Sequence, residues 1–131
     1  MQPDDAKLEV KPYKDKRSLN ANAYAWTLIQ KIADVLRQDK NKVYVEMLDR
    51  YGQSEVVSVR ADIDVNGIFK YYKEVGTGTV NGKEFTHYRV FKGSSEYDTK
   101  EMSILIDGIV SEAKDLGIET LTPEELQRLK G

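Results

Sequence analysis

The pair Asn81-Gly82 lies between two runs of residues with strand-forming composition, 69–75 and 84–91. Such a pair is the strongest short-range signal for a β-hairpin, because both residues accept the positive φ of a tight two-residue turn. We assign the Gly-Thr-Gly-Thr segment at 76–79 to the connection between these strands. A valine-rich run at 56–59 is typical of another strand. The middle of the chain is therefore expected to form a small antiparallel sheet.

The residues before the sheet predict a long helix. Ser18 or Asn20 is suited to cap its start, and it should reach about residue 38. A short strand over residues 8–10, ended by Pro12, is expected before it, and a shorter helix capped by Asn41 is expected after it. The apolar residues of the long helix recur at spacings of three and four: Leu19, Ala23, Trp26, Ile29, Ala33 and Leu36, with Ala25, Leu28, Ile32 and Val35 alongside.

The residues after the sheet predict a second long helix. Asp98 or Thr99 should begin it, and Gly117 should end it as a C-cap does. The segment 122–125 has the pattern of a capping box with Pro at the first helical position, which predicts a short final helix. The second long helix carries one apolar stripe: Met102, Leu105, Ile106, Ile109, Val110, Ala113 and Leu116.

These elements predict an α+β fold, in which a long N-terminal and a long C-terminal helix pack on a small antiparallel sheet, plus a short final helix. The chain has 131 residues, so a single domain over 1–131 is expected, since domains are most often ~100–150 residues long. No apolar run approaches the ~20 residues of a membrane-spanning helix, and no signal-peptide segment follows Met1. We expect a cytoplasmic protein.

The composition excludes several kinds of catalytic site. The chain has no cysteine and one histidine, so it lacks a thiolate nucleophile, a disulfide and the ligands of a zinc site. His87 lies on a predicted strand, where a packed or surface role is more common than catalysis. We assign no catalytic residue.

Two acidic patterns resemble parts of metal sites. Residues 62–67, Asp-Ile-Asp-Val-Asn-Gly, match the first half of a calcium loop, but position twelve is Lys73 where a bidentate Glu is needed. Asp62 and Asp64 could instead serve a magnesium-dependent nuclease, although their spacing equally fits a solvated turn. We assign no metal and no cofactor.

Basic and aromatic residues are interleaved in the middle of the chain, at 70–73, 87–89 and 91–92. This composition is typical of proteins that bind single-stranded nucleic acid, because bases stack on aromatic rings while cations contact phosphates. The alternative is that these aromatic side chains are half-buried packing residues of strands. The net charge of −2 is also unevenly spread, with a basic front half and an acidic C-terminal part.

Two blocks of the sequence resemble the NinB (Orf) family of phage recombination mediators. The segment RSLNANAYAW is similar to the family block R-S-L-x-x-N-x-x-x-W. Residues 92–126 are similar to the family's Gly/Ser-rich turn, long helix and late helix. Together the two quoted segments comprise 45 of the 131 residues. The matching residues are Arg17, Ser18, Leu19, Asn22 and Trp26 in the first block, and Gly93, Ser94, Ser95 and Met102 in the second.

The resemblance implies a non-enzymatic α+β homodimer in a bacterial host. It implies that the protein binds single-stranded DNA and assists recombinase loading against the host's single-strand-binding protein. The sequence departs from the family pattern at Ala21, where the family has Gln, and at Glu96, where it has a basic residue. The N-terminus also looks shorter than in the family, without a first strand and helix.

We predict two places for DNA contact. Lys14, Lys16 and Arg17 are expected in a loop before the first long helix, beside Ser18 and Asn20, because a helix N-terminus favours phosphate. The second place is the turn before the other long helix, with Lys92, Ser94, Ser95 and Tyr97. Leu19, Asn22, Trp26 and Gly93 are interpreted as the packing that supports these places, with ligand contact by Asn22 and Trp26 as the alternative.

Gly108 predicts close approach of another helix, because glycine inside a helix costs about 1 kcal/mol relative to alanine. With Ile104 on the same side, we expect a homodimer contact, and a neighbour within the chain is the alternative. Three hypotheses for function follow: a single-stranded-DNA-binding recombination mediator, a protein–protein adaptor without DNA affinity, and a metal-dependent nuclease.

Overall fold

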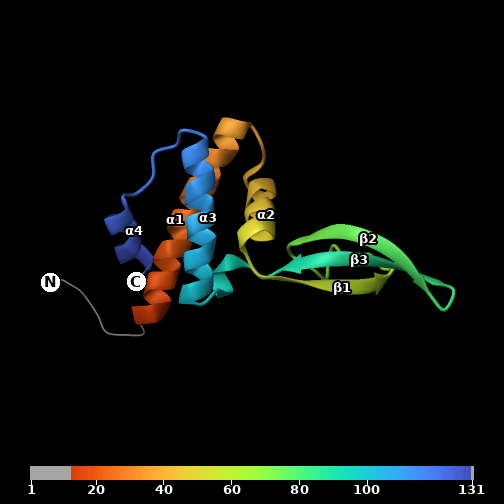
Figure 1. The fold of residues 1–131 in the computed structure, drawn as a ribbon. Helices are drawn as coiled ribbons and strands as arrows, with labels where there is room; N and C mark the ends of the chain where they lie inside the picture. The colour runs from red at the N-terminus through yellow and green to blue at the C-terminus, as the bar shows by residue number, and fades with distance from the viewer. Residues whose placement is uncertain (1–12, 131) are drawn as a thin grey trace.

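The computed structural model describes the backbone of residues 13–130 and the side chains of residues 20–130, so the strand predicted over residues 8–10 lies outside it. The α+β class is confirmed, with a long helix at each end of the described chain, an antiparallel sheet between them and a short final helix (Figure 1). The elements are α1 (Tyr13–Leu36), α2 (Lys40–Tyr51), β1 (Ser54–Arg60), β2 (Tyr72–Val80), β3 (Lys83–Phe91), the 3₁₀ turn η1 (Ser94–Glu96), α3 (Thr99–Asp115) and α4 (Pro123–Lys130).

The helices pack mainly against one another. α1 and α3 lie side by side, with α2 against both and α4 on the outer side of α1 (Figure 1). The core of this helical part is aliphatic, and its fully buried large side chains include Leu28, Ile32, Leu48, Leu105 and Ile109. Two residues of the stripe predicted for α1, Ala23 and Leu36, are instead exposed, because the buried face is centred on Ala25, Leu28 and Ile32.

The predicted caps of the first two helices are wrong. α1 begins at Tyr13, so Ser18 and Asn20 lie inside it. A cap-forming residue is tolerated within a helix when its neighbours favour helix, as the three alanines between residues 20 and 26 do. α2 is capped by Asp39, whose carboxylate accepts hydrogen bonds from the backbone N–H groups of Asn41 and Lys42, at 2.9 and 3.3 Å. Asn41 itself is already helical.

The other two caps are confirmed. Asp98 and Glu101 form a reciprocal capping box at the start of α3, with N···O distances of 2.7 and 3.0 Å. Thr122 and Glu125 make the same arrangement at α4, at 2.9 and 3.1 Å. Gly117 follows α3 with φ +78°, the left-handed conformation that a helix C-terminus favours.

Gly108 meets a neighbour within the chain. A Cβ placed on it would lie 2.2 Å from Cγ of Tyr51 on α2, so only glycine leaves room for that ring. The Tyr51 hydroxyl then donates a hydrogen bond to Glu112, which Arg50 also contacts at 2.9 Å. The expectation that Gly108 contacts a second copy is therefore wrong, since Gly108 is buried against α2, whereas Ile104 is 47% exposed.

The sheet has the strand order β1-β3-β2 and is antiparallel throughout. The predicted hairpin turn is confirmed, with φ values of 50° at Asn81 and 78° at Gly82. The assignment of residues 76–79 to the connection is wrong, because β2 runs through them and pairs Gly76 with His87 and Gly78 with Phe85. An irregularity between Glu74 and Gly76 shifts the register within β2.

The sheet meets the helices at one end only. Phe91, the last residue of β3, is buried in the helical core, and Lys73 and Arg89 pair with acidic residues of α2. Most of the sheet extends to one side of the helices (Figure 1). The connection between β1 and β2 covers one face of this extension, where buried Val65 accompanies an aromatic cluster of Phe69, Tyr72 and Tyr88.

Candidate nucleic-acid interface

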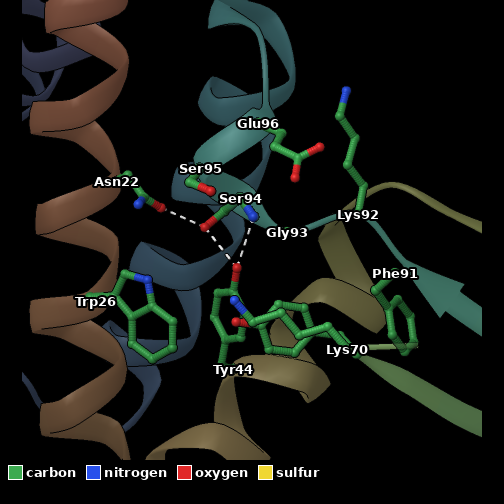
Figure 2. A pocket seen from close by; sticks show the side chains of 11 residues that line it. Asn22, Trp26, Tyr44, Lys70, Phe91, Lys92, Gly93, Ser94, Ser95 and Glu96 are labelled. Carbon is green, nitrogen blue, oxygen red and sulfur yellow. Dashed lines mark hydrogen bonds between the residues drawn. The ribbon is translucent and has the colours of Figure 1, made fainter. Parts of the chain in front are cut away.

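The two blocks that carry the family resemblance meet in the structure. They line a pocket of about 270 Å³ between α1, α2 and the turn that follows β3 (Figure 2). We call it the junction pocket. Its lining residues are Asn22 and Trp26 from α1, Tyr44 from α2, Lys70 and Tyr71 before β2, Phe91 at the end of β3, and Lys92, Gly93, Ser94, Ser95 and Glu96 after it.

A buried hydrogen-bond chain joins the three sides of the junction pocket. The Ser94 backbone N–H donates to the Tyr44 hydroxyl oxygen at 2.8 Å, and the Ser94 hydroxyl donates to Oδ1 of Asn22. The remaining contact, 2.9 Å between the Tyr44 and Ser94 hydroxyls, is then donated by Tyr44. The Tyr44 hydroxyl thus donates to Ser94, and the Ser94 hydroxyl donates to Asn22. The side-chain NH₂ of Asn22 takes no part in this chain and remains available as a donor.

Aromatic rings form the floor of the junction pocket. The Trp26 indole stacks on the Tyr44 ring with centroids 4.1 Å apart and planes 22° apart. Tyr71 meets Tyr44 edge to face, with centroids 5.0 Å apart. Tyr44 is buried, while Trp26 and Tyr71 are half-buried and keep part of their surface open. Asn22 and Trp26 therefore both pack, as predicted, and line the pocket.

Two lysines stand at the junction pocket. Lys70 places its ammonium 5.3 Å from the centroid of the Tyr71 ring, a cation–π distance, and no ion pair links it to a carboxylate of residues 20–130. Lys92 lies over Tyr97 at 5.8 Å and pairs with Glu101 at 3.1 Å. Glu96 contributes one carboxylate to the same rim (Figure 2).

The prediction that the first basic group lies in a loop before the long helix is wrong. Lys14, Lys16, Arg17 and Ser18 are within α1, not in a loop before it, and their side chains lie outside the described part, as does that of Leu19. Asn20 is exposed on the same helix. The structure does not bring the described residues of this group to the junction pocket.

The second predicted group divides into exposed and buried residues. Lys92 and Ser95 are exposed, as a DNA contact requires. Tyr97 is only 4% exposed, and its hydroxyl accepts the Gln53 N–H at 2.8 Å. This burial raises the pKa of the Tyr97 phenol above its usual value. Tyr97 is therefore corrected to a packing residue, and Ser94, 1% exposed, to an internal support with Gly93 beside it.

The structure adds Tyr44, Lys70 and Tyr71 to the site. The basic and aromatic composition of residues 70–73 indicates that Lys70 and Tyr71 are candidates for ligand contact. It does not indicate which of these four residues reaches a pocket. Tyr44 carried no signal in the sequence, because it follows the apolar Val43 in a helix and resembles any core aromatic. Its role depends on contact with Ser94, which is 50 residues away in sequence.

The acidic residues of the connection between β1 and β2 are engaged locally. Asp62 pairs with Arg60 at 3.4 Å, and Asp64 accepts the Asn66 N–H at 3.0 Å, as in an Asx turn. Among the described residues, no group of three or more His, Asp and Glu side chains is placed to hold a metal ion. No helix within this part of the chain is long and apolar enough to cross a membrane.

Comparisons of the chain with protein-family models, curated proteins and solved structures find no match. The family resemblance therefore stays a prediction that rests on the two blocks quoted above. The geometry adds that Asn22 and Ser94, one from each block, are joined by a hydrogen bond.

Proposed function

We propose that the protein binds single-stranded DNA, and that the junction pocket holds one nucleotide of the strand. The observation that carries this proposal is the convergence of Lys70 and Lys92 with the open edges of Trp26 and Tyr71 around one polar pocket. Cations beside aromatic surfaces are the combination that binds single strands without strict sequence preference.

The size and the polarity of the junction pocket support a phosphate-bearing ligand. Its volume of about 270 Å³ lies just below the roughly 300–1,000 Å³ of a typical small-molecule site, so it suits one unit of a longer ligand. The hydrogen-bond donors at its wall are the Asn22 amide, the Ser95 hydroxyl and the ammonium groups of Lys70 and Lys92. Among the described residues the ammonium of Lys70 is unpaired and that of Lys92 is paired with Glu101, and Glu96 adds one carboxylate. Donors and positive charge favour an anionic group.

The broader role that we propose is that of a phage-type recombination mediator. In this role a homodimer in the bacterial cytoplasm would bind single-stranded DNA without cleaving it and assist recombinase loading against the host's single-strand-binding protein. This part of the proposal is supported by the resemblance of the two blocks, five of whose nine matching residues line the junction pocket: Asn22, Trp26, Gly93, Ser94 and Ser95.

The test is a titration of labelled single-stranded oligonucleotide at two salt concentrations. Lys70→Ala should weaken binding several-fold and lower its salt dependence, because one phosphate contact is lost. Lys31→Ala removes an exposed lysine on α1 that is not part of the pocket and is the matched control. Binding that is unchanged by Lys70→Ala, or that salt does not weaken, would contradict the proposal.

One observation favours an adaptor without DNA affinity as the second candidate. Glu96 lines the junction pocket and Glu101 neutralises Lys92, so the anion site has fewer free cations than its lysine count indicates. An adaptor would show no oligonucleotide binding even at low salt. Magnesium-dependent cleavage of the oligonucleotide, lost in Asp62→Ala, would instead support the nuclease hypothesis.

A further inference from the structure

The charged side chains of the sheet are sorted between its two faces. Residues paired across antiparallel strands lie on the same face, and successive residues of a strand alternate between faces. The register therefore places every lysine and arginine of the three strands on one face: Arg60, Lys73, Lys83 and Arg89. Every glutamate of the strands lies on the other face: Glu55, Glu74 and Glu84. We call the first of these the basic face.

The outer half of the basic face has the free positive charge. Near the helices, Lys73 and Arg89 pair with Asp49 of α2, and Lys73 also pairs with Glu46. Farther out, Arg60 makes only a 3.4 Å contact with Asp62 in which both side chains are more than half exposed, and such pairs contribute little. Within the described residues, Lys83 has no carboxylate partner within ion-pair distance.

His87 lies in the centre of the basic face. Its Nδ1 is 2.7 Å from the Ser58 hydroxyl on β1, so that side of the ring is directed across the sheet. On the opposite side of the ring, Cδ2 is the atom nearest to a Cβ placed on Gly76, and Nε2 is the atom nearest to a Cβ placed on Gly78. The bond between Cδ2 and Nε2 therefore runs along β2. The ring lies between Ser58 of β1 and the two glycines of β2.

The glycines of β2 leave room for the ring of His87, which is partly exposed. A Cβ on Gly78 would lie 3.0 Å from Nε2, so a side chain there would push the ring from its place. Phe85 is the next residue of the same face, and Gly78 is its partner across the strands. The basic face thus presents the partly exposed ring of His87, with Arg60 and Lys83 farther out on the same face, and aromatic rings beside cations are the means by which sheet surfaces stack bases of single strands.

We propose that the outer basic face is a second DNA contact, in which a base stacks on His87 while Arg60 and Lys83 contact phosphates. This inference rests on the proposed single-strand binding and extends it to a longer site. Phe91, which lines the junction pocket, is on the same face of β3 as His87. Four residues of strand separate them, about 13 Å, so one strand of DNA can contact both places.

The test uses untagged protein and two oligothymidylates. One has about three nucleotides, below the roughly 4–16 of known single-strand sites, and the other has about twelve. His87 is the only histidine, so its ring C–H signals are assigned at once in a proton NMR spectrum. The longer oligonucleotide should move these signals upfield, as stacking on a base does, and the shorter one should leave them in place.

Variants complete the test by titration with both oligonucleotides. His87→Ala should weaken binding of the longer one roughly 5- to 150-fold, the range for one lost base stack, and leave the shorter one unaffected. His87→Phe keeps an aromatic ring and should retain most of the affinity, and Gly78→Val should behave as His87→Ala. Lys83→Ala should reduce the salt slope by about one, while Lys31→Ala should not.

Two results would overturn the inference while leaving the proposed function intact. One is longer-oligonucleotide binding that depends on Lys70 but not on His87. The other is an equal loss of affinity for both oligonucleotides in His87→Ala. That result would show that His87 acts through the junction pocket or through folding, and not through a second contact. If the wild-type protein binds neither oligonucleotide at low salt, the proposed function itself fails.

Discussion

The helical part and the sheet differ in how their side chains are used. The helical part buries a continuous aliphatic core, whereas the strands contribute only Phe91 to it and leave Val56, Val75 and Val80 exposed. The sheet thus keeps exposed strand residues, charges sorted by face and a partly exposed histidine ring, and it adds little to the core. Burial is concentrated in the helical part, and the recognition that we propose falls to the sheet and to the junction pocket at the boundary between the two regions.

The largest expected effect is the loss of a core side chain in the helical part. Leu105 is 0% exposed, so Leu105→Ala should lower the free energy of unfolding by about 2–5 kcal/mol. Val56 on β1 is 57% exposed, and Val56→Ala should change the free energy of unfolding by less than about 0.5 kcal/mol. Urea unfolding of both variants measures the difference, and a comparable loss in Val56→Ala would break the division between the regions.

A smaller effect is expected at the contact between α2 and α3. Gly108→Ala places a methyl group against the Tyr51 ring, and overpacking of this kind costs about 1–3 kcal/mol. Gly67→Ala, in the connection between β1 and β2, is the matched control, because nothing lies within 4 Å of its added Cβ. Thermal unfolding should separate the two variants, and equal melting temperatures would show that Tyr51 moves aside freely.

The smallest effect is a dependence of stability on pH. The hydrogen bond from Tyr51, with Arg50 in support, holds the pKa of Glu112 below its usual value of 4.5. Because the folded-state pKa is lowered, the ionised Glu112 contributes stability above the unfolded-state pKa, and the contribution is lost as pH falls through the folded-state pKa.

Unfolding measured from about pH 6 to pH 3 checks this expectation, since that window spans the usual pKa of a glutamate. Glu112→Gln should flatten the acid decline of the melting temperature. Asp62→Asn removes the exposed carboxylate beside Arg60 and should follow the wild-type curve, because such pairs contribute little. A flattened curve in Asp62→Asn alone would assign the acid sensitivity to the sheet.

Local signals in the sequence predicted local structure well. The Asn81-Gly82 turn and the capping boxes of α3 and α4 each depend on residues within four positions of one another, and all three are present. The start of α1 and the cap of α2 are not predicted correctly from the sequence, because several nearby residues are equally suited to cap a helix. The strand through residues 76–79 was missed because glycine is unfavourable in strands, and here its pairing with β3 prevails.

The site was predictable only in part, because burial is set by contacts between distant residues. The resemblance selected Asn22 and Ser94, which are 72 positions apart and bonded to each other. Nothing in the sequence indicated that Tyr97 turns inward to Gln53, or that Tyr44 joins the two blocks. The partial exposure of His87 likewise depends on the register that sets glycines beside it.

The glycines beside His87 also have a consequence for motion. Glycine loses more backbone freedom on folding than any other residue, so two glycines in one strand weaken its attachment to the sheet. The amide hydrogens of β2 should therefore exchange with solvent faster than those of α1 or α3. If DNA binds across the basic face as we propose, it should suppress that opening, and binding would then be coupled to local folding of the hairpin.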